Sequence, residues 1–270
     1  MARDSAYAHV SLVPIDAPTG PRVSTGLVCE RVHFAMGQGL CLAGEHGAES
    51  LYFAVPFGND FTPRARVQLA GAPTFARVSR DGLFGAASVL LAQPTELNPE
   101  APAQTLILDL GAGTVVADLE DFVVTRDDAT FDAPDRSLWG VTFSADSDVF
   151  YVTLRTAGNT YLVEGSLTGR RLKVIHPNVS APALSPDGTR VAYAKLVSSI
   201  GPTFRFHILD LATMIETPLA EATSIDDQME WLDDQHLLYG LAADTWVVPA
   251  DGTGNPSLFL PNGLSASVVR

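Results

Sequence analysis

The side chains of this 270-residue sequence that could do chemistry most directly are carboxylates, which gather at two places. The first cluster contains Asp127, Asp128, Asp132 and Asp135. The second contains Asp226, Asp227, Glu230, Asp233 and Asp234. Oxygen ligands at such density can bind Ca²⁺ or Mg²⁺, but neither cluster has the spacing of an EF-hand loop. In an acidic chain we interpret them as solvated loops, with a divalent-cation site as the alternative.

Other catalytic patterns are missing from the sequence. The six histidines are scattered, with no HxH or HExxH motif, so we expect no zinc or iron site built mainly on histidine. The segment Gly263-Leu-Ser-Ala-Ser267 lacks the final glycine of a GxSxG nucleophile elbow. The sequence therefore predicts no serine hydrolase.

The two cysteines, Cys29 and Cys41, lie in one predicted hairpin. A turn at residues 36–39 pairs Ala35 with Leu40, which places Cys29 away from Cys41 and on the other face. This register favours two buried thiols. A Cys29–Cys41 disulfide remains the alternative.

Composition excludes several classes of protein. There are 31 acidic and 17 basic residues, which gives a formal charge of −14, so a nucleic-acid partner is not expected. Disorder is excluded because 46% of the residues are hydrophobic and only 18% are charged. No apolar run is long enough to span a membrane, and the N-terminus lacks the pattern of a signal peptide. We expect a soluble chain that carries no signal or anchor.

Short apolar runs separated by turn residues recur along the chain, and they predict strands rather than helices. The clearest copy is 181–194, in which Ser185-Pro-Asp-Gly188 forms a tight turn between two strands. Related inner hairpins lie at 75–91 and 139–153, and more degenerate copies lie at 229–239 and 28–42. A second, outer hairpin follows each inner one, and another begins the chain. We count six outer hairpins and five inner ones, with residues 264–269 as a single further strand.

Four strands per unit at a period of roughly 40 to 55 residues is typical of propeller blades. The sequence predicts an all-β, six-bladed β-propeller with four-stranded antiparallel blades, as a single domain over residues 1–270. In it, a C-terminal inner strand joins the N-terminal outer strands and closes the ring. A two-sheet sandwich is the alternative. The expected blades are 27–70, 71–120, 121–177, 178–222, 223–262, and 263–270 with 7–26.

Ser185-Pro-Asp-Gly188 followed by Val191-Ala-Tyr193 resembles the WD40-like or PD40 repeat of TolB-type propellers. The pattern covers nearly the whole chain, and the chain is similar to actinobacterial TolB-like translocation proteins. The resemblance implies a bacterial, extracytoplasmic or periplasmic propeller that serves as a protein-binding scaffold. The N-terminal α/β domain of TolB has no counterpart in this sequence, so a role in the Tol pathway is not carried over.

A propeller usually binds its partners at the channel mouth, where the inner strands begin. Alignment of the repeats places one set of polar and aromatic residues there. The candidate binding residues are Glu30, Arg31, Arg77, Arg136, Trp139, Asp226, Asp227 and Gln228.

Three functions compete. We favour a non-catalytic binding module without a cofactor, whose partner is a protein, a peptide or a small ligand, and we expect it to be a monomer. Membrane contact would require an anchor that this chain does not carry. The alternative is a divalent-metal-dependent hydrolase or lyase with Ca²⁺ or another divalent cation at the mouth, ligated by Glu30, Asn178, Asp226 and Asp227. A third possibility is a structural domain whose partner is fused elsewhere.

Overall fold

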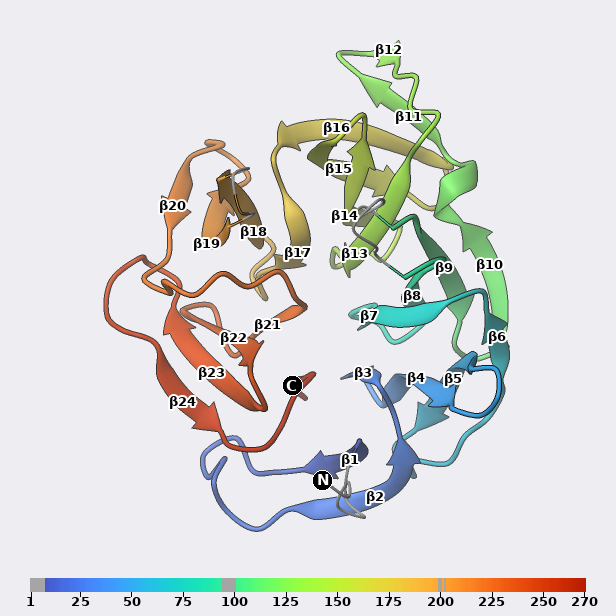
Figure 1. Ribbon diagram of the computed structural model, residues 1–270, viewed down its shortest axis with the longest axis vertical. Coiled ribbons are helices and arrows are strands. Elements are labelled where there is room, and N and C mark those ends of the chain that lie inside the picture. The colour runs from blue at the N-terminus through green and yellow to red at the C-terminus, as the bar shows by residue number, and fades with distance from the viewer. Residues whose placement is uncertain (1–7, 94–100, 199–200, 202) are drawn as a thin grey trace.

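The computed structural model describes residues 8–93, 101–198, 201 and 203–270. These residues form strands β1 to β24 and one short 3₁₀ helix, η1 (Leu119–Asp121), without an α-helix. The strands build antiparallel blades around a common centre (Figure 1). The chain is therefore an all-β propeller, as the repeat pattern predicts. Among the described residues, no helix has the length and apolar character needed to cross a membrane.

Five blades contain four consecutive strands each, ordered from the centre outward. Blade 1 consists of β3 (Arg31–Ala35), β4 (Gln38–Glu45), β5 (Leu51–Gly58) and β6 (Val67–Leu69). Blade 2 consists of β7 (Ala72–Val78), β8 (Phe84–Leu90), β9 (Ala103–Asp109) and β10 (Thr114–Asp118). Blade 3 consists of β13 (Ser137–Phe143), β14 (Val149–Thr156), β15 (Asn159–Ser166) and β16 (Arg171–Pro177).

Blade 4 consists of β17 (Ser180–Leu184), β18 (Arg190–Ser198), β19 (Thr203–Asp210) and β20 (Glu216–Pro218). Blade 5 consists of β21 (Met229–Trp231), β22 (His236–Leu241), β23 (Asp244–Pro249) and β24 (Ser257–Leu260). Blade 3 is widened by β11 (Val123–Arg126), which pairs in parallel with β16, and by β12 (Ala129–Thr130). The β11–β12 hairpin projects from the rim of the ring (Figure 1).

The prediction of a sixth four-stranded blade is wrong. At its place between blades 5 and 1, β1 (His9–Leu12) and β2 (Val23–Val28) pair only with each other. The C-terminal segment 263–270 forms no strand. A four-stranded blade needs an inner hairpin as well as an outer one, and eight residues are too few for two strands and a turn.

The C-terminal segment nevertheless lies beside β3, near the centre of the ring (Figure 1). Ser265 accepts a hydrogen bond from Val32 N (3.3 Å), and Ser267 accepts one from Phe34 N (3.0 Å). Serine hydroxyls thus replace the backbone ladder that was expected there. At the rim, Arg22 donates to the backbone oxygens of residues 261 and 262, which ties the N-terminal hairpin to the C-terminal segment.

The inner turns follow the predicted Ser-x-Asp pattern in blades 2, 3 and 4. In blade 4, Ser185 Oγ donates to Asp187 Oδ1 (2.6 Å), and Asp187 accepts from Thr189 N (2.9 Å). Gly188 has φ +75°, a left-handed conformation that suits glycine. These local bonds fix the hairpins whose first strands surround the centre.

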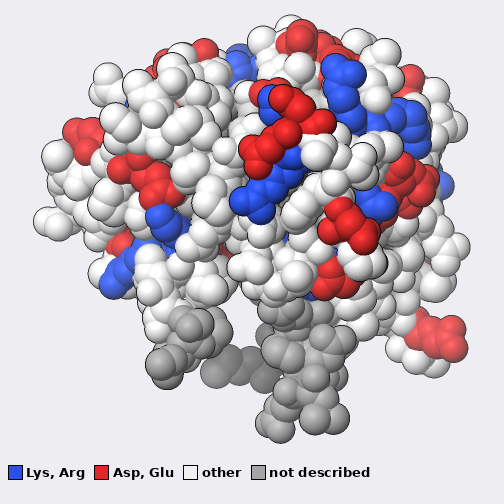
Figure 2. Space-filling view, turned by 90° about the horizontal axis from the view of Figure 1, so that it is seen from above, with Lys and Arg blue, Asp and Glu red and all other residues white. Residues whose placement is uncertain are grey.

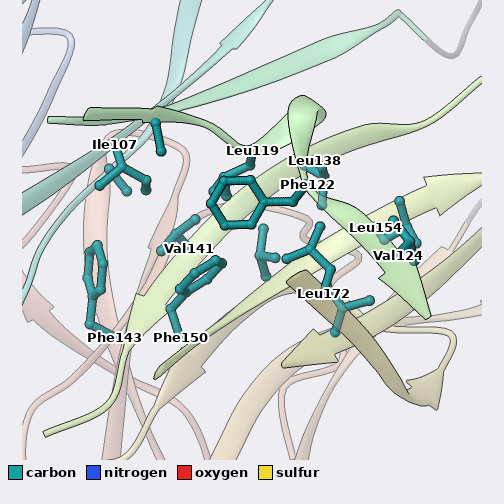
Figure 3. Packing of buried hydrophobic residues seen from close by; sticks show 14 residues of the cluster. Ile107, Leu119, Phe122, Val124, Leu138, Val141, Phe143, Phe150, Leu154 and Leu172 are labelled. Carbon is teal, nitrogen blue, oxygen red and sulfur yellow. The ribbon is translucent and has the colours of Figure 1, made fainter. Parts of the chain in front are cut away.

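Apolar side chains fill the spaces between neighbouring blades. In the cluster between blades 2 and 3, the ring of Phe122 lies near that of Phe150, with 6.4 Å between centroids (Figure 3). Both residues are at most 1% exposed. Burial of a phenylalanine side chain contributes roughly 1.5–3 kcal/mol, so this packing holds the blades in fixed relative positions.

The two cysteines form a disulfide, with 5.4 Å between the Cα atoms of Cys29 and Cys41. The expectation of two thiols is wrong because it assumed a longer turn. The actual turn has two residues and pairs Ala35 with Gln38, not with Leu40. The chain also bends before β3, since Glu30 N donates to Leu42 O, and this bend carries Cys29 toward Cys41.

Candidate functional site

Four of the predicted residues gather where the inner strands begin, and we call Arg31, Asp226, Asp227 and Gln228 the mouth cluster. Arg31 opens β3 of blade 1, and its Nε donates to Thr74 O of blade 2 (2.7 Å). Its Nη2 donates to Asp227 Oδ1, just before blade 5 (3.3 Å). One guanidinium therefore links three blades, because the ring brings residues 196 positions apart together.

Asp226 joins blade 4 to the same cluster. Its Oδ1 accepts a hydrogen bond from Ser180 Oγ (2.8 Å). The residue is exposed to solvent, although protein atoms surround its carboxyl group. Burial raises the pKa of Asp226 and the neighbouring Asp227 charge raises it further, against the opposing effect of the Ser180 bond.

Gln228 crosses from blade 5 to blade 2, where its Oε1 accepts a hydrogen bond from Ala76 N (3.0 Å). A backbone N–H can only donate, so this bond fixes the orientation of the amide and leaves Nε2 as a donor. Within the part of the chain that the structure describes, the buried Nε2 has no hydrogen-bond partner.

A small hollow of about 10 Å³, with room for about one water molecule, adjoins the mouth cluster. Arg31, Asp227 and Gln228 line it together with residues of blade 5 and of the C-terminal segment. The mouth cluster thus stands at the edge of a concave surface that carries both charges and hydrogen-bonding groups.

Deeper in the ring lies an axial triad of Arg77, Glu230 and His33, from blades 2, 5 and 1. Arg77 Nη1 pairs with Glu230 Oε2, and Nη2 donates to Met229 O (2.8 Å). Burial alone raises the pKa of Glu230, but the Arg77 charge, the interactions with His33 and the Arg270 charge outweigh it and hold that pKa at about 2. Glu230 is therefore an ionised carboxylate at neutral pH.

His33 is neutral in the triad. Burial lowers the pKa of His33 first, and the Arg77 charge lowers it further. His33 Nδ1 accepts a hydrogen bond from Val78 N (3.1 Å), and Nε2 lies 3.1 Å from Arg77 Nη1 and 3.4 Å from Glu230 Oε2. The imidazole consequently serves as a structural bridge between blades 1, 2 and 5.

Two further arginines occupy the opposite end of the ring. Arg80 donates to the backbone oxygens of Ser185 and Pro186, across the centre from blade 2 to blade 4. Arg270 donates to Trp231 O, and its Nη1 lies 3.8 Å from Glu230 Oε1. Side-chain bonds therefore connect non-adjacent blades along the whole centre.

The remaining predicted residues do not join the mouth cluster. Glu30 pairs with His46 (2.9 Å), and the Arg155 guanidinium lies 5.6 Å from the Trp139 ring. Arg136 donates to Phe122 O (2.7 Å). Arg77 belongs to the axial triad, below the mouth.

The proposed metal ligands also do not converge. The Asn178 amide bonds both backbone groups of Leu196 (2.9 and 3.1 Å), and Glu30 faces His46, so neither joins Asp226 and Asp227. In the described ranges, no group of three or more His, Cys, Asp or Glu is placed to hold a metal ion. In the first acidic cluster, the Asp127 and Asp128 side chains are 96% and 95% exposed at the β11–β12 turn.

Sequence reasoning missed His33, Arg80 and Arg270 as residues of the centre. For His33 a signal exists, because it lies two positions after Arg31 on one strand and so shares its face. For Arg80 and Arg270 the sequence indicates only that one lies at a predicted turn and the other is the last residue given. On the face shown in Figure 2, acidic and basic side chains are interspersed rather than gathered into one basic area.

No protein-family model matches the chain, and no curated protein matches it. Solved structures do. TolB from Acinetobacter baumannii aligns with a TM-score of 0.54 at 13% identity, over 82% of this chain and 52% of that chain. A puromycin-hydrolysing peptidase from Mycobacterium tuberculosis aligns with a TM-score of 0.55 at 15% identity, over 84% of this chain and 36% of that one. A chain of a nidogen/laminin complex aligns with a TM-score of 0.54 at 9% identity, over 87% and 82%.

This chain spans about half of the TolB chain and about a third of the peptidase. The matches include binding proteins and a hydrolase, so they do not decide between the two classes of function. At these identities the likeness concerns the fold alone. The chain has a TolB-like β-propeller fold.

Proposed function

We propose that this protein is a non-catalytic, extracytoplasmic TolB-like propeller that binds a protein or peptide partner at the mouth of its ring. The observation that carries the proposal is the mouth cluster. Arg31 and the consecutive residues 226–228 come from two distant parts of the chain and are held in place by bonds to other blades. Arg31, Asp227 and Gln228 line a small hollow. Preorganised polar groups around a concave surface are typical of a binding site.

The fold supports a scaffold role. TolB and a chain of the nidogen/laminin complex share the propeller architecture, and the second was solved in a protein complex. In this chain the centre is occupied by inter-blade bonds of the axial triad, which favour a rigid platform over a moving catalytic apparatus.

The disulfide supports the extracytoplasmic part of the proposal. Disulfides such as Cys29–Cys41 persist in oxidising compartments and are rare in the bacterial cytosol. Thiol alkylation of intact producing cells before lysis tests this part. An oxidised pair is expected, and two alkylated thiols would contradict the location.

The binding function is tested with a phage-displayed library of random 12-residue peptides. Selection on the wild-type protein is paired with counter-selection on the R31A/D227A double variant. We expect enriched peptides that bind the wild type and lose at least tenfold in affinity on the double variant. Failure to enrich any peptide that binds the folded wild type, or equal binding to the double variant, would refute binding at the mouth.

A further inference from the structure

The ring position between blades 5 and 1 is only partly occupied by the described chain. The five blades each have an inner hairpin next to the centre. The sixth position has an outer hairpin, β1–β2, and an irregular segment, 263–270, that is held to β3 by serine side chains. The described residues therefore place no inner hairpin at this position.

The hollow beside the mouth cluster lies at the same position. Leu238, Tyr239 and Gly240 on β22 line it from blade 5, and Ser265 and Ala266 line it from the C-terminal segment. In a complete ring, the inner strands of a sixth blade would pack against this side of blade 5. The hollow thus lies on the side of blade 5 that such strands would cover.

The polar groups around the hollow indicate what could enter it. Arg31 is paired with Asp227, and Glu230 is paired with Arg77, so the charges of the lining are balanced. Gln228 also lines the hollow, and its buried Nε2 has no partner among the described residues. A buried donor without an acceptor costs about 1–3 kcal/mol. A neutral carbonyl oxygen would satisfy this donor without bringing an unpaired charge into the site.

Gly240 lines the hollow at a point where blade 5 lies close to the C-terminal segment. A Cβ atom at this position would lie 3.1 Å from Leu264 Cδ2 and 3.7 Å from Asp227 Oδ2. Its backbone is not in the left-handed region, so conformation alone does not require glycine here. A larger side chain would occupy the space between blade 5 and the C-terminal segment.

From these observations we propose that an extended segment of a partner protein lies across the opening of this small hollow at the sixth ring position. It places a neutral amide carbonyl, from its backbone or from an Asn or Gln side chain, against Gln228 Nε2. This inference rests on the proposed function and specifies where on the mouth the partner binds.

The test uses the most enriched 12-residue peptide from the library, labelled with fluorescein, in fluorescence-polarisation titrations of the full chain. G240V fills the hollow. Q228E keeps an oxygen for Ala76 N–H but removes the free donor and adds a charge. G47V is the matched control, because a Cβ there lies no closer than 3.7 Å to any other group. We expect at least tenfold weaker binding to G240V and Q228E, and a change below twofold for G47V.

Alanine substitution of each Asn and Gln of the peptide then identifies the acceptor. Loss at one of these residues assigns a side-chain amide, and no loss assigns the backbone. Where G240V fails to fold, as judged by its melting curve, G240A and Q228E carry the test. Unchanged binding to Q228E and to the glycine variant, with loss on R31A/D227A, would overturn this inference and leave binding at the mouth intact. No binding to the wild type would instead refute the proposed function itself.

Discussion

Replacing Arg77 with methionine should destabilise the ring strongly, because it leaves the Glu230 carboxylate buried without its main partner. The Arg77 and Glu230 side chains are 11% and 8% exposed. Glu230 has a pKa of 4.5 in its ordinary state and about 2 in the folded protein. At 1.36 kcal/mol per pKa unit, the folded environment stabilises the ionised form by about 3 kcal/mol. Loss of one partner of a buried ion pair costs about 3–5 kcal/mol, in agreement with this value.

Urea unfolding of R77M at pH 7, followed by tryptophan fluorescence, measures the loss. The control is R66M, because Arg66 and Glu45 form an ion pair in which both side chains are at least half exposed, and such pairs contribute below about 1 kcal/mol. Adding E230Q to R77M should recover part of the stability, since the buried charge is then removed. A loss below about 1 kcal/mol for R77M, or no recovery in the double variant, would refute the assignment of an ionised, buried Glu230.

Three further outcomes follow from the same geometry. Stability should fall as the pH drops below 6.5, because the pKa of His33 is lower in the folded protein and the unfolded chain therefore binds the proton first. It should fall further from pH 4.5 toward pH 2, as the carboxylate of Glu230 is protonated. A melting midpoint that does not change with pH would contradict this. C29S/C41S should lose on the order of 3 kcal/mol in urea unfolding, and an unchanged midpoint would show that the disulfide constrains nothing. G165A should cost about 1–3 kcal/mol by calorimetry, because its Cβ would lie 2.2 Å from a buried phenylalanine ring, and a neutral effect would show that this ring can move.

The blade hairpins were predictable because their signals are local. In Ser185-Pro-Asp-Gly188, the serine and aspartate bond groups within a few residues of themselves, and glycine supplies the left-handed φ. Such bonds depend little on the rest of the chain, so the residue types alone indicate the turn. The same turn bonds form at Ser79 in blade 2 and at Ser144 in blade 3.

The sixth blade was predicted because the expectation of a closed ring was given more weight than the number of strands in the sequence. Five inner and six outer hairpins were visible in the sequence, and closure of the ring suggested that residues 264–269 would complete the set. One segment cannot supply both strands of an inner hairpin. The residues Ser265 and Ser267 instead bond β3 through their hydroxyls, a solution that no strand pattern encodes.

The disulfide was not predicted because the assumed register of the β3–β4 hairpin differs from the actual one by two residues. Met36 and Gly37, with φ +46° and +77°, form a two-residue turn, whereas the sequence reasoning placed the turn over four residues. A longer assumed turn shifted every partner on β4, and Cys41 with them. The bend at Glu30 was a second local event that strand periodicity does not report.

The candidate site shows which part of a long-range arrangement a repeat can reveal. Alignment of repeats assigns each residue a height along its blade, and it placed Arg31, Asp226, Asp227 and Gln228 at one level. The alignment does not say toward which face a side chain points, but strand geometry does, because neighbouring residues on a strand face opposite sides. Arg31 opens β3 and reaches Asp227, whereas Glu30 lies at the bend before the strand and pairs with His46. The alternation along β3 brings His33, two residues beyond Arg31, to the centre, where it meets Glu230.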